Sequence, residues 1–386
     1  MKFLLIYVPN LRFSFEEDWC TSTIGENFRL SSGLTPSTKE KVYFNNGIIP
    51  WINSGELKNK YISSTENKLT LDAVKKHNLT IYPMDTMVIA IYGLEAAGVR
   101  GKASITKMDS TISQSCMAFN SLGNVLTQFM YYVYKKEAQI LGTRYAQGTK
   151  QQNLSSDLLS SYKLLYPSKE EQLKIVYFLS LIDEKIETQI KIIDTLLSEI
   201  NSIRSLIFNK SSLKWIPLKD IVAEQDIKLK RGKVIPKHKK NLKYIYPVYS
   251  SSITNSGLMG YSDSYMFNQE LITWSIDGGG NFFYRKKHKF NITNVSGYMI
   301  LNENLFNYQF IVQSLIWQHE KLKFDYQTKA HPSVVESLYK IPIMDLEEQH
   351  KYACLFSNLN EKYELELHTL DLLDMQKKYL LKNMFV

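Results

Sequence analysis

The sequence predicts a mixed α/β (α+β) fold in which two globular α/β domains are joined by two long antiparallel, coiled-coil-like helices in a pseudo-twofold internal repeat. Its 386 residues suffice for two or three domains. The triplet Glu170–Gln172 recurs as Glu347–Gln349, and the same register then holds without a gap to Phe208 and Phe385. We therefore expect globules over 1–167 and 213–342, and spacer helices over 168–212 and 343–386.

The first globule, residues 1–167, reads as mixed α/β because short apolar runs such as Met87–Tyr92 are broken by turn residues. The opening Met1–Val8 is also apolar, but Pro9 interrupts it well before the ~18 residues of a membrane span. We interpret it as part of this globule and expect no membrane association. The three cysteines lack metal or redox spacing, which suits the cytoplasm.

The two spacer segments share a helical pattern. No Gly or Pro occurs between Ser168 and Phe208, and Ser168 followed by Glu171 fits a capping box. So long an apolar stripe needs a partner, and the nearest is the other copy; two helices lying separately on the globules remain an alternative. The stripe of the first copy comprises Leu179, Ile182, Ile186, Ile190, Ile193, Ile200, Ile203 and Ile207, and that of the second Phe356, Leu359, Tyr363, Leu367, Leu370, Leu380 and Met384.

The second globule, residues 213–342, is predicted to share a frame with the first. Each begins near a tryptophan, Trp19 or Trp215, and each ends in a related polar turn, at 148–153 or 327–332. A β-rich run at 270–274 again indicates mixed α/β structure. Because the interiors do not align, we expect different contents within the shared frame.

Charge divides between the globules and the helices. The chain carries a net +9, yet helix 168–209 has five basic and seven acidic residues, and helix 343–386 has five and eight. The globules therefore carry the basic surface, and the second has 18 Lys and Arg against 10 Asp and Glu. A single lysine cluster is often only solvated surface, but repetition in two globules favours an anionic partner, with nucleic acid first among them.

No catalytic constellation can be assembled. The loop 93–103 departs from a phosphate-binding loop at Ala96 and Ala103, and Gly278–Gly280 does not open a clear helix. No His-x-x-x-His pair occurs, the Asn-Pro-Pro-aromatic signature of adenine methylation is missing, and Glu56–Lys58 only imitates part of a nuclease motif. We therefore predict a recognition component, without enzymatic activity and with neither metal nor cofactor of its own.

A set of short motifs follows a fixed order along the chain: Pro9–Phe13 before Glu16–Trp19, then Gly33–Ser37, Ile49–Gly55 and Glu170–Gln172 in the first half, and Tyr249–Ser252, Gly278–Gly280 and Glu347–Gln349 in the second. This order resembles the DNA-specificity subunit of type I restriction–modification systems over almost the whole chain. The second half departs from the usual frame, because Pro36-Ser37 is echoed only loosely by Val234–Pro236.

This resemblance implies two target-recognition domains, each reading one half of a split double-stranded DNA sequence. The helices would set the spacing and dock two methyltransferase (modification) subunits. Those partners would bind S-adenosylmethionine, and restriction motor–nuclease subunits would need ATP and Mg²⁺ for cleavage. Two rigidly separated globules fit this reading, because they can meet two major-groove sites about one turn apart.

Loop residues with cationic or amide side chains are the expected DNA contacts, with Lys and Arg on phosphates and Asn, Gln, Ser and Arg on base edges. Arginine is scarce, so a loop arginine is preferred for bidentate guanine contact. Two rivals remain open: a two-domain DNA-binding repressor or scaffold, and a metal-dependent nuclease. The candidates are Arg100, Lys102, Arg144, Lys150 and Gln152 in the first globule, and Ser251, Asn255, Asn281, Arg285, Lys287 and Lys329 in the second.

Overall fold

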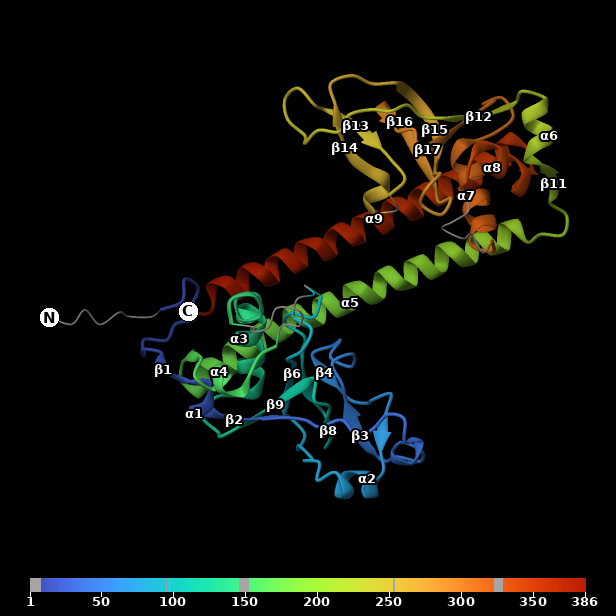
Figure 1. The fold of residues 1–386 in the computed structure, drawn as a ribbon. Helices are drawn as coiled ribbons and strands as arrows, with labels where there is room; N and C mark the ends of the chain where they lie inside the picture. The colour runs from blue at the N-terminus through green and yellow to red at the C-terminus, as the bar shows by residue number, and fades with distance from the viewer. Residues whose placement is uncertain (1–7, 95, 97, 146–152, 253, 323–328) are drawn as a thin grey trace. The chain divides into compact units, whose positions relative to one another are not determined.

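The fold was analysed in a computed structural model, which describes residues 8–94, 96, 98–145, 153–252, 254–322 and 329–386. The chain divides into two compact units (Figure 1). Unit 1 comprises residues 1–188 and 370–386, and unit 2 comprises Gln189–Thr369. The predicted mixed α/β class with an internal repeat is confirmed, and each unit is described by itself below.

Unit 1 contains a five-stranded sheet of order β2-β9-β6-β7-β4, a three-stranded sheet of order β5-β3-β8 and a separate two-stranded sheet of β1 and β10. The apolar alternation of the sequence places Met87 and Ile89 on one face of β6 and Val88 and Ala90 on the other, each face lining its own core. The elements are β1 Cys20–Thr23, α1 Ile24–Asn27, β2 Phe28–Ser32, the 3-10 helix η1 Lys41–Tyr43, β3 Ile49–Ile52, β4 Tyr61–Ile62, β5 Lys68–Leu69, α2 Leu71–Lys76, β6 Met87–Ala90, β7 Ala103–Thr106, β8 Thr111–Ile112, β9 Cys116–Ser121, α3 Thr127–Ile140, the π-helix η2 Leu141–Tyr145, α4 Ser156–Ser160 and β10 Lys163–Tyr166.

Unit 2 is built on a six-stranded sheet of order β12-β17-β15-β16-β13-β14 and a separate β11–β18 pair. Both long helices contribute to both units: α5 is Lys169–Phe208 and α9 is Leu346–Asn383. The other elements are β11 Lys214–Pro217, α6 Leu218–Ala223, β12 Ile227–Arg231, β13 Tyr246–Tyr249, the 3-10 turn η3 Thr254–Gly257, β14 Leu258–Ser262, β15 Phe267–Ser275, β16 Phe282–Ile292, β17 Ser296–Leu301, α7 Tyr308–His319, α8 Pro332–Leu338 and β18 Lys340–Ile343.

The two units share one topology, although their sequences do not align inside the globules. The order β2-β9-β6-β7-β4 corresponds strand for strand to β12-β17-β15-β16-β13, and β4–β7 and β13–β16 are both parallel pairs. Strand β14 is an addition of unit 2. The loops and side chains differ between the two units, but the strand plan is common.

The two tryptophans near the globule starts do not occupy equivalent positions. Strand β1 pairs Thr21 with Leu165, and β11 pairs Trp215 with Pro342, which occupies the place of Leu165 in the repeat register. Trp215 therefore corresponds to Thr21, whereas Trp19 precedes its strand and is buried. An indole at either position can cover the same core, so a tryptophan near the domain start does not fix the register.

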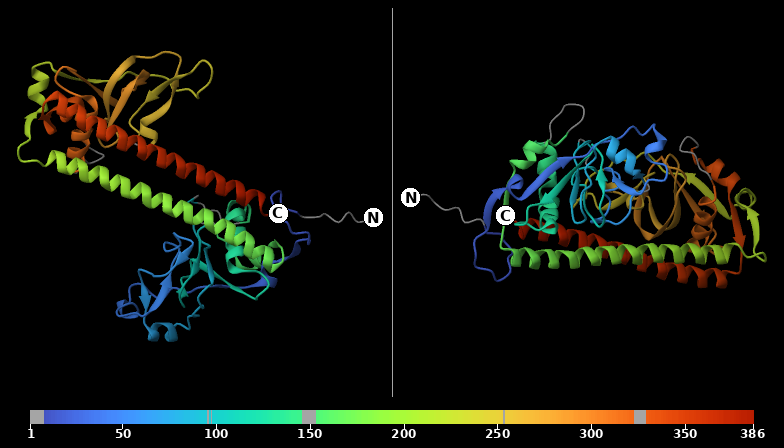
Figure 2. Two further views of the ribbon diagram at one scale, coloured as in Figure 1. Left: turned by 180° about the vertical axis from the view of Figure 1, so that it is seen from behind. Right: turned by 90° about the horizontal axis from the view of Figure 1, so that it is seen from below.

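In each unit a domain helix, α3 in unit 1 and α7 in unit 2, packs in one core with the sheet and the long helices. Figure 2 gives two further views of these elements. In unit 1 the start of α5, with Leu179, shares a core with the end of α9, with Leu380 and Met384. In unit 2 the end of α5, with Ile207, shares a core with the start of α9, with Phe356. The helices are thus antiparallel partners, and the alternative of two separately lying helices is excluded.

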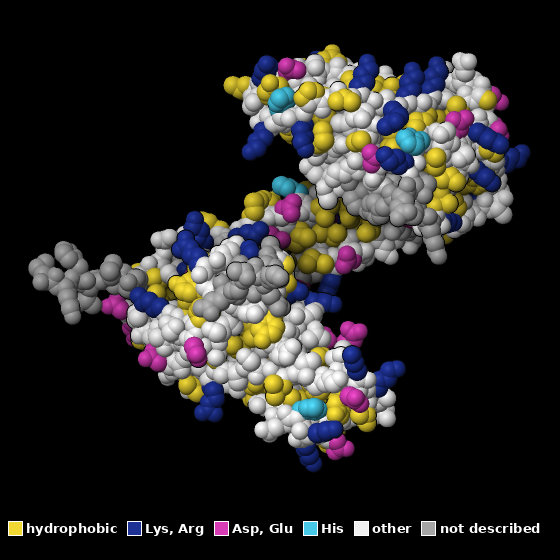
Figure 3. All heavy atoms as spheres, viewed as in Figure 1, with side chains coloured by type: hydrophobic (Ala, Val, Ile, Leu, Met, Phe, Trp, Pro, Cys, Tyr) yellow, Lys and Arg dark blue, Asp and Glu magenta, His cyan; other side chains and the backbone are white. Residues whose placement is uncertain are grey.

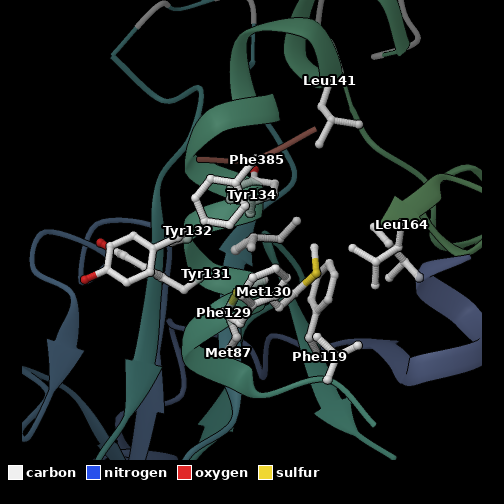
Figure 4. Packing of buried hydrophobic residues seen from close by; sticks show 14 of the residues in the cluster. Met87, Phe119, Phe129, Met130, Tyr131, Tyr132, Tyr134, Leu141, Leu164 and Phe385 are labelled. Carbon is white, nitrogen blue, oxygen red and sulfur yellow. The ribbon is translucent and has the colours of Figure 1, made fainter. Parts of the chain in front are cut away.

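An aromatic pair repeats almost identically in the two cores. Phe129 of α3 meets Phe385 with ring centroids 5.3 Å apart and planes at 48° (Figure 4). Phe310 of α7 meets Phe208 at 5.4 Å and 49°. The offset from Phe208 to Phe385 is that of the Glu-Glu-Gln repeat, and the offset from Phe129 to Phe310 is slightly longer. The first offset defines equivalent residues in the long helices, and the second defines them in α3 and α7.

The repeated Glu-Glu-Gln triplet has a structural role in unit 1. Gln172 is fully buried, and its Oε1 accepts a hydrogen bond from the Leu126 amide at 2.9 Å. Its Nε2 donates to the carbonyl oxygens of Asn124 at 3.2 Å and Pro167 at 3.0 Å. One amide side chain therefore ties the start of α3 to the start of α5.

Gln349 makes the same three bonds in unit 2. Its Oε1 accepts from the Asn307 amide at 2.9 Å, and its Nε2 donates to the carbonyls of Leu305 and Met344 at 2.9 and 2.8 Å. We call Gln172 and Gln349 the glutamine clips. They explain why the triplet recurs, since buried backbone groups must find partners.

Candidate DNA-recognition surfaces

Two loops that follow equivalent strands form the centre of the candidate surfaces. In unit 1 this loop is 91–102, between β6 and β7, and in unit 2 it is the turn 276–281, between β15 and β16. Each loop begins with the same backbone bond, from Leu154 N to Ile91 O at 3.0 Å and from Ala330 N to Ile276 O at 2.9 Å. The sequence singled out both as glycine loops, and the structure places them at the same position in the repeat.

Close packing accounts for two of the three glycines of the turn 276–281, Gly278 and Gly280. A Cβ on Gly278 would collide with Ser275 Oγ and Ser251 O. Gly280 has φ +80°, and a Cβ there would lie 3.0 Å from His319 Cε1. His319 in turn shares a hydrogen bond of 2.7 Å with the Tyr339 hydroxyl, and burial lowers its pKa. The turn is thus supported by His319, which is itself held by Tyr339.

Three of the predicted residues of unit 2 surround this turn. Ser251 accepts a hydrogen bond on its carbonyl from Ser275 Oγ at 2.7 Å, and Asn281 Nδ2 donates to Gly278 O at 3.3 Å. Lys329 is exposed and lies 3.4 Å from Asp277. The side-chain amide of Asn281, the backbone carbonyl of Ser251 and the ammonium group of Lys329 therefore lie at one turn.

Arg285 was predicted as a loop residue, and this placement is corrected. It lies in strand β16, only 5% exposed, with its guanidinium centre 3.8 Å from the Tyr249 ring centroid. Nε donates to Thr273 Oγ1 at 3.0 Å, and Nη2 donates to Ser256 O at 2.7 Å. Burial lowers its pKa to about 10, so it stays charged at neutral pH.

The buried guanidinium supports the loop that carries Asn255. Asn255 is exposed and has φ +49°, and the adjacent Ser256, also at φ +49°, accepts the bond from Arg285. Lys287 is exposed further along β16, and the structure does not bring it to the turn. The signal that sequence reading missed is Tyr249, whose ring covers the arginine.

In unit 1 the structure joins Arg100 to the element that carries Arg144. Arg100 Nε donates to Leu94 O at 2.7 Å, and a Cβ on Gly142 would lie 2.8 Å from Arg100 Cγ. Arg144, in the π-helix η2, is exposed, and Lys102 is half-buried in the loop 91–102. The candidates Lys150 and Gln152 lie outside the described residues.

Lys and Arg side chains are distributed over the visible face of both units (Figure 3). Within the described ranges, no group of three or more His, Cys, Asp or Glu side chains is placed to hold a metal ion. In that same part of the chain, no helix is long and apolar enough to cross a membrane. The loops present hydrogen-bonding groups and positive charge, and both suit contacts with phosphates and base edges.

Curated relatives are type I specificity subunits. The chain is 32% identical to the type I restriction enzyme MjaIX specificity subunit of Methanocaldococcus jannaschii over 182 residues, covering 45% of this chain and 40% of the relative. It is 27% identical to the EcoR124I/EcoR124II specificity subunit of Escherichia coli over 181 residues, 46% of this chain and 44% of the relative. Each match thus spans less than half of the relative.

Solved structures share the fold over nearly the whole chain. The S subunit of a type I restriction–modification system from M. genitalium superposes with a TM-score of 0.65 at 20% identity, covering 98% of this chain and 99% of that one. A chain from a study of complex assembly and conformational transition of the type I R-M system gives 0.56 at 10% identity, covering 97% and 99%.

The family described as type I restriction modification DNA specificity domain matches residues 16–197 and 214–374. These two matches lie one in each half of the internal repeat and together take in most of the chain. They include the glutamine clips and both glycine loops. The protein therefore belongs to the type I restriction modification DNA specificity family.

Proposed function

We propose that the chain is the sequence-recognition subunit of a type I restriction–modification complex, acting in the cytoplasm on double-stranded DNA. Each globule reads one half of a bipartite target, and the long helices set the spacing between the halves. The observation that carries this proposal is the repeat itself: one strand plan occurs twice, and each copy presents a glycine loop after the equivalent strand.

The candidate residues divide by chemistry. Lys102, Lys287 and Lys329 would bind phosphates, because an ammonium group is a point charge without a preferred plane. Arg144 would read a base edge in the first half-site, where Arg100 packs against the element that carries it. Ser251, Asn255 and Asn281 would read base edges in the second half-site. Arg285 would act through the loop 250–257 that it supports.

The long helices would dock two methyltransferase subunits. In unit 1 their outward surface carries large apolar side chains, including Leu173, Tyr177 and Tyr379, which are 58%, 66% and 58% exposed. S-adenosylmethionine would be bound by those partners, and ATP and Mg²⁺ by restriction motor–nuclease subunits. This chain would supply recognition only.

The first test is reconstitution with a type I methyltransferase subunit from the same genome, followed by methylation mapping. We expect one copy of this chain to two partner subunits by native mass measurement, and methylation only when both half-sequences are present. Neither component alone should methylate. DNA binding without any methyltransferase complex would instead identify a repressor or scaffold, and cleavage by the purified chain with Mg²⁺ would identify a nuclease.

The second test addresses the spacing. Helix α5 has 40 residues, about 60 Å at a rise of about 1.5 Å per residue. Four residues inserted after Asp194 add about 6 Å, nearly two base pairs at about 3.4 Å each, and keep the apolar stripe near its face. We expect unchanged half-sequences with a longer unread gap.

A two-residue insertion is the matched control, because it rotates the stripe by about 200° and should damage the helix pair. An unchanged gap in an active four-residue variant would show that the helices do not set the spacing.

A further inference from the structure

Unit 1 contains a pocket of about 450 Å³ beside the end of the chain. Apolar side chains of α3, α4 and β10 line it together with Phe385, Val386, Tyr145 and Tyr162. Its polar lining residues are Lys136, Glu137, Ser161 and Lys163. The two tyrosine rings meet edge to face at 5.4 Å, and Tyr145 is 40% exposed, so the pocket opens at the surface. None of the residues assigned to DNA contact above lines it.

The equivalent place in unit 2 is filled by the chain's own indole rings. Trp215 and Trp317 stack there with centroids 5.7 Å apart and planes at 16°. Both rings pack on Phe208, at 6.1 and 5.8 Å. Phe208 is the equivalent of Phe385, the aromatic wall of the pocket in unit 1.

The residues that occupy these two positions in unit 1 are not aromatic. Trp317 corresponds to Lys136 of α3, by the offset that also relates Phe129 to Phe310. Trp215 corresponds to Thr21, because each pairs with the equivalent residue of its partner strand. Thr21 lies opposite Leu165, which lines the pocket. Two indoles are thus replaced by a threonine and a lysine around an otherwise preserved frame.

The ammonium group of Lys136 contacts polar groups at the pocket. Lys136 Nζ donates to the Val386 carbonyl at 2.6 Å and lies 3.1 Å from Glu137 Oε1. The other carboxylate oxygen of Glu137 accepts from the Tyr162 hydroxyl at 2.8 Å. The polar groups therefore satisfy one another at the edge and leave the apolar wall free.

We propose that this pocket is a binding site for a planar aromatic side chain presented by a partner polypeptide. The frame that surrounds it holds indole rings in the other half of the same molecule, and pockets of ~300–1,000 Å³ accommodate groups of this size. Tryptophan and tyrosine are the usual anchors of protein interfaces, because a large ring buries much area at little entropic cost. The site is independent of DNA reading.

The test uses N-acetyl-L-tryptophanamide as the probe and the full-length chain as the target. By ligand-observed NMR we expect one site with a dissociation constant on the order of 1 mM, as for a ligand of that size. Lys136→Trp fills the pocket as unit 2 does and should weaken binding by at least about tenfold. Lys136→Met removes the same ammonium contacts without filling the pocket and should keep binding.

Gln139→Trp, on an exposed position of the same helix, is the control for an added indole and should leave binding unchanged. The reciprocal double variant Trp215→Thr/Trp317→Lys removes both indoles and should open a second site, so that the number of bound probes doubles. If that variant fails to fold, Thr21→Trp places the indole on β1 opposite the lining residue Leu165 and should reduce binding as Lys136→Trp does.

Two further probes distinguish the source of the group. N-acetyl-L-leucinamide should bind more weakly than the tryptophan probe, and adenosine should not compete with it. Equal binding of the leucine probe would overturn the assignment to a planar ring, and tighter binding of adenosine would assign the pocket to a nucleobase instead. Binding that persists undiminished in Lys136→Trp, or no binding to the native chain, would also overturn the proposal.

Discussion

In each unit the globule is attached to the long helices, but the two units use different side chains at equivalent positions. Tyr132 of α3 donates to buried Asp183 of α5 at 2.6 Å, and Lys60 and Lys377 flank that carboxylate at 3.3 and 2.6 Å. Lys60 belongs to the segment before β4, so the network links this outlying part of the globule to both long helices. One buried negative charge thus serves two lysines.

In unit 2 the position of Tyr132 is held by Gln313, and the charge is reversed. Gln313 accepts from Nε of Arg204 at 2.7 Å, and Arg204 Nη1 reaches Asn201 at 2.7 Å and Glu320 at 3.3 Å. The glutamine clips and the phenylalanine pairs are common to both units, whereas these charged contacts are not. The shared contacts define the frame, and the unshared ones attach each globule to its own stretch of helix.

The largest expected effect comes from breaking the buried charge network. Asp183→Ala should lower the stability of unit 1 by about 3–5 kcal/mol, because it leaves two lysines without their counter-charge. Its repeat equivalent, Asn360→Ala, should cost less than about 1 kcal/mol. Amide hydrogen exchange in α3 and α7 measures both units in one protein, and equal costs would show that the network is incidental.

The glutamine clips sharpen the comparison from the other side. Gln172→Ala and Gln349→Ala each leave one buried amide and two carbonyls unpaired, so each should cost about 2–3 kcal/mol in its own unit. The two values should agree within about 1 kcal/mol, because the bonded groups are the same. Denaturant unfolding followed by hydrogen exchange gives both values, and a clearly unequal pair would contradict a common frame.

A smaller difference should depend on pH. Burial, reinforced by nearby Lys377, lowers the pKa of Lys135 to about 8, and its repeat equivalent is the uncharged Ile316. Between about pH 8 and the unfolded pKa near 10.5, the unfolded chain binds more protons, so stability rises with pH.

We therefore expect unit 1 to gain on the order of 1–3 kcal/mol from pH 7.5 to 9.5 relative to Lys135→Ile. Unit 2 serves as the internal control in the same exchange experiment. A flat difference between the native chain and the variant would contradict the lowered pKa.

The smallest expected effect concerns DNA. Lys329→Ala should weaken binding to all sequences alike by about 1 kcal/mol and reduce the slope of log affinity against log salt by about one. Lys219→Ala, an exposed lysine on α6 of the same unit, is the matched control and should change neither quantity. Loss at one half-site sequence alone would make Lys329 a base reader.

The repeated long helices could be predicted from the sequence because they produce local patterns in it. The stripe of α5 and the recurrent Glu-Glu-Gln triplet depend on spacing along the chain, and spacing is visible without a structure. The common strand plan was not visible, because a β-strand needs only alternation and accepts many side chains.

The candidate surfaces were predictable only in part. Gly278–Gly280 was singled out from sequence, and the structure explains it by contacts with Ser275, Ser251 and His319. Arg285 was misplaced because its exposure depends on a partner distant in the chain, Tyr249, which no local pattern reveals. Charge alone does not distinguish an arginine that binds a ligand from one that supports a loop.

The midpoint of the helix pair has a consequence for how this protein came to be one chain. Gln189 Nε2 donates to Glu366 O at 2.9 Å and to Glu366 Oε2 at 2.6 Å, and the two positions are related by the repeat offset, so each meets its own equivalent. A symmetric pair of identical half-chains would set glutamate against glutamate or glutamine against glutamine. Two copies joined in one chain can change separately at the two positions, and here a donor faces an acceptor.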